Sequence, residues 1–306
     1  MQERLASSWM GLRCLPEPRI TLWRRAIALF HEFKSAHWTG PFFKAGYRPP
    51  LPSLPTYVVC RPFLDGSGRT CEPDIVSACP RSWSVLELTS DPSTKEADLT
   101  RYAKMPSTNL TNYGLVGPSS EPIVFSARYS PVDDGPFPSI ILGDSLATRN
   151  LELVPDSELH DALQGSENVA LTRVPEVPFS FVPESQPAEL RVGLVDFVMA
   201  AFQPGSSGIR VTDMVEQGLE RLSGCVSPTA KERLGRAIES ELRSLLAGEW
   251  GLQSDLSLKD GVLRAKEGFT RHPKSLDRLQ RLLRAWASKT AGPRTTPLDR
   301  WDTTST

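Results

Sequence analysis

The sequence predicts an α/β protein built from two domains, and three observations lead to this prediction. The 306 residues exceed the usual length of a single domain, and their 39% apolar content is enough to form a hydrophobic core. Runs with the composition of strands lie in the first half of the chain, whereas the last third has helical periodicity. A proline-rich, acidic segment separates them. We therefore expect a strand-containing domain, a connector, a helical domain and a flexible tail, with the bounds 1–149, 150–187, 188–290 and 291–306.

Composition excludes several classes of protein. The sequence has no apolar stretch long enough to span a bilayer and no secretion signal at its N-terminus, so we expect a soluble, cytoplasmic protein without a membrane partner. Its five cysteines include no C-x-x-C pair, which favours reduced thiols over disulfides or a thiolate zinc site. The phosphate-binding loop G-x-x-x-x-G-K-[ST] is absent from the sequence, and we expect no nucleotide cofactor.

The N-terminal elements follow from periodicity and turn signals. Apolar residues recur every three or four positions over 20–38, which predicts an amphipathic helix. A capping box that joins Ser93 to Glu96 indicates a second helix, which runs to about residue 105. Five further segments have the composition of strands: 57–64, 72–77, 83–89, 122–129 and 139–143. This order predicts a mixed sheet flanked by helices.

Two acidic residues lie on the hairpin that the second and third strands are expected to form. Simple pairing across a turn at Pro80 and Arg81 places Asp74 opposite Glu87 on one face of the sheet, with Cβ atoms about 5 Å apart. Two carboxylates at that distance repel each other unless a proton or a cation lies between them, and Mg²⁺ takes such carboxylates together with water and substrate phosphate. A register shifted by one residue would instead put the two acids on opposite faces and leave Asp74 as an ordinary turn residue.

The order of these elements, with a Pro-Asp at 73–74 and a glutamate on the next strand, resembles the PD-(D/E)xK nuclease superfamily, which includes restriction endonucleases. The resemblance covers residues 20–145 and implies a restriction-endonuclease-like mixed sheet flanked by helices. It further implies that Asp74 and Glu87 bind Mg²⁺ or Mn²⁺, with the carbonyl of Leu88 as another ligand. Glu32 matches the acid that the first helix of that superfamily often contributes.

The chain departs from this superfamily at the catalytic lysine. That lysine is expected two residues after the glutamate, where this sequence has Thr89. A neutral hydroxyl cannot replace an ammonium that stabilises charge on the attacked phosphate. Some members supply the lysine from the following helix, and Lys95 is the candidate catalytic lysine at that position. Either the lysine has moved to this helix, or the core is a non-catalytic remnant of a nuclease.

The C-terminal segments are predicted to form three helices, a β-hairpin and a last helix, at 188–203, 211–223, 228–247, 256–266 and 275–288. Thr212 and Ser227 suit helix N-caps, and Pro228 suits the first helical position. Asp260-Gly261 is a strong signal for the turn of the hairpin. This order resembles winged-helix DNA-binding domains, whose third helix enters the major groove.

Basic residues gather on the third of these helices, on the hairpin and on the last helix. Such clusters can neutralise phosphates, and they make DNA affinity strongly dependent on salt. A protein partner and a merely solvated basic face are the alternatives. The candidate nucleic-acid-binding residues are Lys231, Arg233, Arg236, Lys259, Arg264, Lys266, Arg271, Lys274, Arg278 and Arg281.

These patterns predict a DNA-binding protein with a metal-dependent endonuclease core, in the setting of phage defence or of mobile-element biology. In that case Asp74 and Glu87 hold the metal, Lys95 stabilises the developing charge and the basic C-terminal helices hold the duplex. The alternative belongs to another class of function: a non-catalytic DNA- or protein-binding subunit of a larger assembly, with a vestigial nuclease fold. Metal affinity separates the two, because only a working nuclease site needs it.

Overall fold

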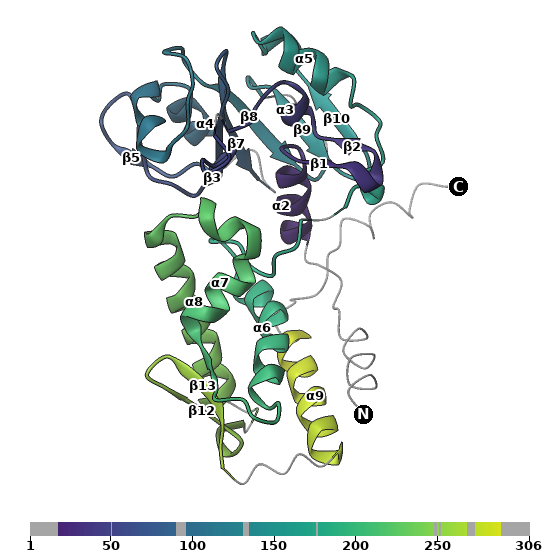
Figure 1. Cartoon of the computed structure of the whole chain (residues 1–306), viewed down its shortest axis with the longest axis vertical. Helices are drawn as coiled ribbons and strands as arrows, with labels where there is room; N and C mark the ends of the chain where they lie inside the picture. The colour runs from purple at the N-terminus through teal and green to yellow at the C-terminus, as the bar shows by residue number, and fades with distance from the viewer. Residues whose placement is uncertain are drawn as a thin grey trace. The chain divides into compact units, whose positions relative to one another are not determined.

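The computed structural model describes residues 18–49, 51–89, 96–130, 135–175, 177–247, 250, 252–267 and 273–288. The protein is a mixed α/β structure that contains a six-stranded mixed sheet flanked by helices (Figure 1). The chain divides into two compact units. Among the described residues, the sheet unit comprises 18–183 together with 216–233, and the helical unit comprises 184–215 together with 234–288.

The central sheet belongs to the sheet unit and has the strand order β10-β9-β8-β7-β6-β3. Strands β3, β6 and β7 are antiparallel neighbours, β7, β8 and β9 run parallel, and β10 pairs antiparallel to β9. The sheet is thus antiparallel at both edges and parallel in the middle. Its strands are Tyr57–Val59 (β3), Ile75–Ala78 (β6), Trp83–Leu88 (β7), Ile123–Arg128 (β8), Ser139–Leu142 (β9) and Leu146–Arg149 (β10).

The parallel step from β7 to β8 requires a crossover connection, and helix α4 (Glu96–Tyr102) supplies it, followed by the short turns η3 (Ser107–Asn109) and η4 (Thr111–Tyr113). Leu99 and Tyr102 of α4 are buried in the same apolar cluster as Val85 of β7 and Val124 of β8. Alternate residues of a strand point to opposite faces, so α4 covers the face that Val85 shares with Glu87.

The other face of the sheet is covered by helices α2 (Pro18–Ala28) and α3 (Pro41–Lys44). The ring of Phe42 lies 5.7 Å from the ring of Phe125, which follows Val124 and so points to the face opposite α4. Helix α2 contacts β9. The sheet is therefore buried on both faces, as expected for strands that carry almost continuous apolar runs.

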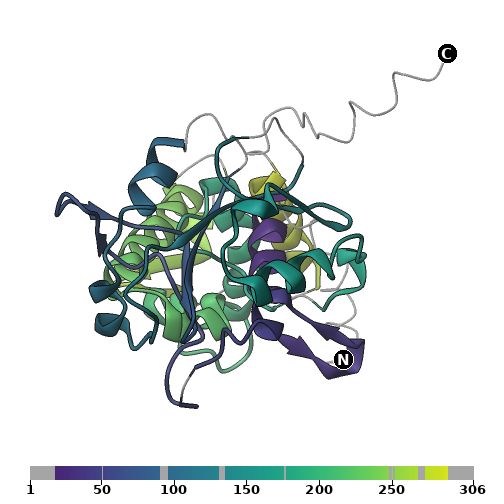
Figure 2. The same cartoon turned by 90° about the horizontal axis from the view of Figure 1, so that it is seen from above.

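The helix predicted over 20–38 is shorter in the structure, because α2 ends at Ala28. The following residues form the two-stranded hairpin of β1 (Glu32–Phe33) and β2 (Trp38–Thr39), which Figure 2 shows in purple, with the turn η1 (Lys34–Ala36) between them. The indole of Trp38 donates to the Ala28 carbonyl at 3.0 Å and satisfies the end of α2. Trp38 is buried without belonging to a helix, so apolar spacing alone overestimated the length of α2.

The segment predicted as a single strand over 57–64 is divided in two. Cys60 adopts a left-handed conformation with φ 46° and ends β3, and Phe63–Leu64 then forms β4, which pairs with β5 (Thr70–Cys71) in a separate hairpin. The side chain of Asp65 holds the turn between β4 and β5: it accepts hydrogen bonds from the amides of Ser67 and Arg69, both at 2.9 Å.

The segment 150–187, expected to be a connector, is folded and belongs to the sheet unit as far as residue 183. It contains η5 (Leu151–Leu153), α5 (Ser157–Gln164) and η6 (Leu171–Arg173). Asp156 caps α5 by accepting from the Leu159 amide at 3.1 Å. At least one of the acidic residues that suggested a solvated linker is therefore a helix cap.

The C-terminal region contains the predicted helices and the predicted hairpin, although the end of α7, η7 and the start of α8 belong to the sheet unit. Strand β13 lies in the middle of a three-stranded sheet of order β11-β13-β12, and Asp260 and Gly261 both have positive φ in its turn, as the Asp-Gly signal requires. Among the described residues, no helix has both the length and the apolar character that crossing a membrane requires. The elements of this region are α6 (Pro187–Ala201), β11 (Ile209–Arg210), α7 (Val211–Leu219), η7 (Glu220–Cys225), α8 (Pro228–Ala247), η8 (Leu252–Ser254), β12 (Leu256–Lys259), β13 (Val262–Ala265) and α9 (Pro273–Ser288).

Candidate functional site

The hairpin of β6 and β7 has the register that simple pairing predicts. Ile75 pairs with Leu86, and Ala78 pairs with Trp83. The next opposed position along this ladder joins Asp74 to Glu87, and the Asp74 amide donates to the Glu87 carboxylate at 3.4 Å. The shifted register, which would have separated these two residues, is therefore excluded. We call Asp74 and Glu87 the acid pair.

Both members of the acid pair are buried, with 0% of Asp74 and 2% of Glu87 exposed. One carboxylate oxygen of Asp74 accepts a hydrogen bond of 2.6 Å from the amide of Leu88. The amide and carbonyl of one strand residue point to the same side of the strand, so the carbonyl of Leu88 also points toward the side where Asp74 lies. The three ligands implied by the nuclease resemblance on these two strands are thus neighbours.

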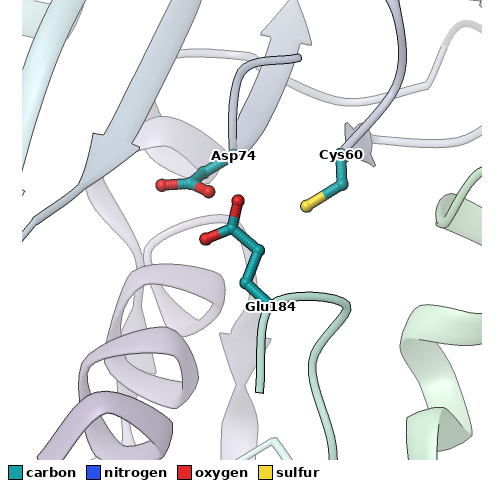
Figure 3. A group of neighbouring side chains, drawn as sticks. All are labelled: Cys60, Asp74 and Glu184. Atoms are coloured by element: carbon teal, nitrogen blue, oxygen red, sulfur yellow. The ribbon is translucent and has the colours of Figure 1, made fainter. Parts of the chain in front are cut away.

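Cys60 lies beside Asp74 at the ends of β3 and β6, as Figure 3 shows. Its sulfur lies within 4.8 Å of a carboxylate oxygen of Asp74, and its amide donates to the Asp74 carbonyl at 3.0 Å. A thiolate suits softer metals than Mg²⁺, so Cys60 is a neighbour of the acid pair and not an expected ligand of a hard cation. Glu184, also labelled in Figure 3, belongs to the helical unit and is not counted in this site.

The donor set fits Mg²⁺ or Mn²⁺. Two adjacent carboxylates and a backbone carbonyl are hard oxygen ligands, and buried carboxylates at adjacent positions gain stability from a cation between them. Tyr102 of α4 lies on the same face, where burial and then the negative charges of Glu87, Asp98 and Asp74 raise the pKa of its hydroxyl. The tyrosine therefore stays neutral and borders the site as a hydroxyl group.

Glu32, predicted as a further metal ligand from the first helix, is not placed at this site. It lies after the end of α2, in the separate two-stranded sheet of β1 and β2, where it pairs with Thr39. Its side chain is exposed, whereas both members of the acid pair are buried. The expected position of Glu32 on the first helix is wrong, because α2 ends at Ala28 and the chain then turns into a hairpin.

Thr89 occupies the position two residues after Glu87, where the nuclease superfamily has its catalytic lysine. Its amide donates to the Ala127 carbonyl at 3.0 Å, and its side chain is buried on the face that carries Glu87. Lys95, predicted to supply the positive charge, lies outside the described residues, and α4 is described from Glu96.

A buried arginine, Arg128, lies at the end of β8 beside Thr89. The parallel register pairs Glu87 with Ser126 and Leu88 with Ala127, so the next position along β8 is level with Thr89. Arg128 donates to the hydroxyl of Ser126 at 3.0 Å from Nε, and to that of Ser139 at 3.3 Å from Nη2. Sequence reasoning missed Arg128 because it did not predict which strand lies beside β7; the alternation of Ser126 and Arg128 in an apolar strand was the available signal.

The predicted nucleic-acid-binding residues fall into two groups. Lys231 contacts Glu216 at 2.8 Å and Arg233 contacts Glu72 at 3.1 Å, and all four residues belong to the sheet unit. These two cations are thus already matched with carboxylates. Arg236 is exposed on α8.

The second group lies on the β12–β13 hairpin and on α9. Within the described part of the chain, the exposed side chains of Lys259, Arg264 and Lys266 form no ion pair. Helix α9 buries an apolar stripe and exposes its basic residues on the other side, while Arg271 lies outside the described residues. The stripe contains Leu279, Leu283 and Trp286, and the exposed cations include Lys274, Arg278 and Arg281.

Comparison with known proteins adds no relative to these observations. No family model, no curated protein and no solved structure matches this chain. Any inference about its function therefore rests on its own residues and on their geometry.

Proposed function

We propose that this protein is a metal-dependent DNA endonuclease, with the acid pair as its metal site. The observation that supports this most is the burial of two carboxylates at directly opposed positions of β6 and β7, each with a backbone amide as a hydrogen-bond donor. Buried charges are costly unless they are compensated. A divalent cation between the two adjacent carboxylates would compensate both.

The order of the elements supports the same proposal. Apart from α3 and the two small hairpins β1–β2 and β4–β5, helix α2 is followed by three antiparallel strands, by the crossover helix α4 and by the parallel strand β8, which is the order of the PD-(D/E)xK nuclease core. The acid pair lies at the start of the second of these strands and within the third, as the motif of that superfamily requires. The restriction-endonuclease-like assignment is part of our proposal.

In this mechanism Asp74, Glu87 and the carbonyl of Leu88 would hold Mg²⁺ or Mn²⁺, which when bound supplies positive charge and an activated water. Water attacks the phosphorus, its oxygen forms the new P–O bond, and the bond to the leaving oxygen breaks. One proton of the water goes to the leaving alcohol. The amides of Asp74 and Leu88 fix both carboxylates before substrate arrives, so little reorganisation is needed.

For the helical region we propose a winged-helix DNA-binding role. The order α6, β11, α7, α8, β12, β13 and the sheet order β11-β13-β12 support this assignment. The exposed cations of the hairpin and of α9 would contact backbone phosphates. Such contacts position DNA without reading its sequence.

A non-catalytic DNA-binding subunit is the second candidate. Two observations favour it: Thr89 replaces the expected lysine, and the acid pair is almost completely buried. Under this proposal the sheet unit would be a framework for a partner, and the basic hairpin and α9 would bind DNA without cutting it.

Cleavage of labelled double- and single-stranded DNA in Mg²⁺ or Mn²⁺ tests the proposal, with Mn²⁺ binding measured calorimetrically beside it. We expect Glu87→Gln to lose both Mn²⁺ binding and cleavage. Glu121→Gln is the matched control, because Glu121 is an exposed acid of the same unit just before β8, and it should retain both. Retained DNA binding without cleavage in any metal would contradict the nuclease and support the second candidate.

A further inference from the structure

We infer that the exposed face of the three-stranded sheet β11-β13-β12 binds the phosphate backbone of double-stranded DNA. We call this surface the cationic face and define it by Arg210, Lys259 and Arg264, which come from β11, β12 and β13. The inference rests on the proposed DNA-binding role of the C-terminal region. It adds to that role one surface, the class of nucleic acid, and Arg210, a residue that sequence reasoning did not select.

The strand register places these three cations on the same side of the sheet. Arg210 and Lys259 are both register partners of Val262 on β13, and directly opposed residues of an antiparallel pair share a face. Arg264 lies two residues after Val262 on the same strand, so it points to that side as well. All three strands therefore contribute one positive charge to one face.

The other face of this sheet is apolar and buried. Leu263 of β13 and Leu256 of β12 are 0% and 1% exposed, whereas Arg210, Lys259 and Arg264 are exposed. A shift of the register by one residue would bury the cations and expose the leucines, so hydrophobic burial fixes which side the charges occupy. The cationic face is thus a stable property of the fold.

Arg264 lies between two small residues. Ser257 is its register partner on β12, and Gly208 lies opposite it on the other side, one position before the pairing of Ile209 with Leu263. A Cβ atom on Gly208 would overlap Cγ of Arg264, so the apolar stem of the arginine packs across the glycine backbone. This contact supports the stem while the residue remains exposed.

The charges of this face are not neutralised by the protein. Within the described part of the chain, the side chains that define the cationic face form no ion pair and no hydrogen bond. Lys266 continues the face beyond β13 and lies opposite Asp255, whose carbonyl accepts from its amide at 2.8 Å, and Asp260 lies in the hairpin turn. Four cations therefore stand against two acids, and the face keeps a positive charge that can displace counterions from DNA.

The spacing and the chemistry of the face suit a DNA duplex. Neighbouring strands lie about 4.8 Å apart, so the three cations arise within about 10 Å of one another, while duplex DNA carries one charge per roughly 1.7 Å of its axis. None of the described residues that the register places on this face is aromatic, so unpaired bases have no ring on which to stack. Contacts with phosphates alone carry no sequence information, and we expect binding that is independent of sequence.

Fluorescence anisotropy of the whole chain with a labelled duplex tests the inference, in EDTA so that no metal-dependent cleavage interferes. We expect the variant with both Arg210→Ala and Arg264→Ala to lower the slope of log affinity against log salt by about two, and Arg210→Ala alone by about one. Arg243→Ala is the matched control. Arg243 is an exposed arginine of the same unit that already pairs with Glu239 at 2.6 Å, so the slope should change by less than about a half.

Lysine variants distinguish charge from base recognition. The variant with both Arg210→Lys and Arg264→Lys should keep the wild-type slope, because contacts with phosphates depend on charge. A loss of affinity for one sequence only would instead indicate that the planar guanidinium forks read bases, which would contradict a backbone-binding face. Urea midpoints of all variants should equal that of the wild type, since the substituted side chains are exposed.

Failure of the inference and failure of the proposed function give different results. If the wild type binds duplex DNA in a salt-dependent way and the double alanine variant keeps the same slope, the cationic face is not the DNA surface and would be assigned to an acidic protein partner. Tighter binding of single-stranded than of duplex DNA, lost in the double alanine variant, would overturn the choice of a duplex. Absence of salt-dependent DNA binding in the wild type would overturn the proposed DNA-binding role and, with it, this inference.

Discussion

Single side chains determine several local structures of this protein, and Asp65 is the clearest case outside the candidate site. Its carboxylate accepts from Ser67 and Arg69 in the turn between β4 and β5, and it forms an ion pair of 3.1 Å with Arg101 of α4. Hydrogen bonding from the Ser67 hydroxyl is the main cause that lowers the pKa of Asp65 below its ordinary value of 3.8. The turn therefore depends on the charged form of this residue.

The sign of the pH effect follows from that shift. A carboxylate whose pKa is lower in the folded state stabilises the protein above its unfolded pKa, and this stabilisation is lost as pH falls through the folded pKa. We expect Asp65→Asn to unfold at lower urea concentration than wild type at pH 7, with the difference shrinking below about pH 4. Urea midpoints at several pH values measure this; a difference that stays constant down to acidic pH would contradict it.

At the scale of residues, the sequence was sufficient to predict a site whose residues are neighbours in one hairpin. Asp74 and Glu87 were predictable because a tight hairpin determines which residues oppose each other. Arg128 was not, because its position depends on a parallel pairing between strands separated by a whole crossover. Glu32 was misplaced because apolar periodicity continues past the end of α2 in residues that are buried without being helical.

At the scale of elements, close packing decides the residue at one helix position. Gly218 lies in α7, and a Cβ atom there would lie 2.1 Å from a ring carbon of Phe181. The Gly218 carbonyl also accepts from the amides of Ser180 and Phe181. Glycine is unfavourable within helices, so its presence here reflects the approach of Phe181 and not the preference of the helix.

We expect Gly218→Ala to destabilise the protein by about 1–3 kcal/mol, although alanine is the better helix former, because the buried ring of Phe181 must move. Gly235→Ala in α8 is the matched control. A Cβ at Gly235 meets only ordinary contacts of 3.7 and 3.8 Å, so this change should be neutral or stabilising by about 0.5–1 kcal/mol. Urea unfolding of both variants measures the contrast, and equal effects would contradict the packing argument.

Most elements were predictable because their signals are local. The Asp260-Gly261 turn and the Ser227-Pro228 helix start have signals within a few residues, and both structures are present. The amide of Ala230 bonds to the hydroxyl of Ser227 at 3.0 Å, as an N-cap requires. By contrast, the division of 57–64 into two strands depends on the left-handed conformation of Cys60. Residues other than glycine seldom adopt this conformation, so the sequence does not predict it at a cysteine.

At the scale of the whole molecule, the distribution of ion pairs makes a prediction about DNA binding. Lys231 and Arg233 are matched with carboxylates, whereas Arg278 is exposed on α9 without an ion pair among the described residues. Only cations that are not already neutralised can release counterions from DNA on binding. Under the proposed function, the contacts with DNA phosphates should therefore lie on α9 more than at the start of α8.

We expect the variant with both Arg278→Ala and Arg281→Ala to reduce the slope of log affinity against log salt by about two. The variant with both Lys231→Ala and Arg233→Ala is the comparison and should change the slope by less than about one. Fluorescence anisotropy with a labelled duplex between about 50 and 200 mM salt measures both. A larger effect from the α8 variant would place the DNA surface on α8 instead.

The order of segments along the sequence could not predict which residues belong to the sheet unit. The expected boundary at residue 187 followed from proline and acidic content, yet residues 216–233 belong to the sheet unit. Val226 forms a bridge to Val59, and the Cys225 carbonyl accepts from Arg61 at 3.2 Å. These contacts join residues more than 160 positions apart, and no local sequence pattern predicts them.

The return of residues 216–233 to the sheet unit has a consequence for how this protein can be divided and how it can evolve. The two units alternate along the polypeptide, so no single cut separates them. A gene fragment that ends before α7 would encode a sheet unit without the partners of Val59, Arg61 and Phe181. Exchange of either unit between genes would therefore require more than one cut in the coding sequence.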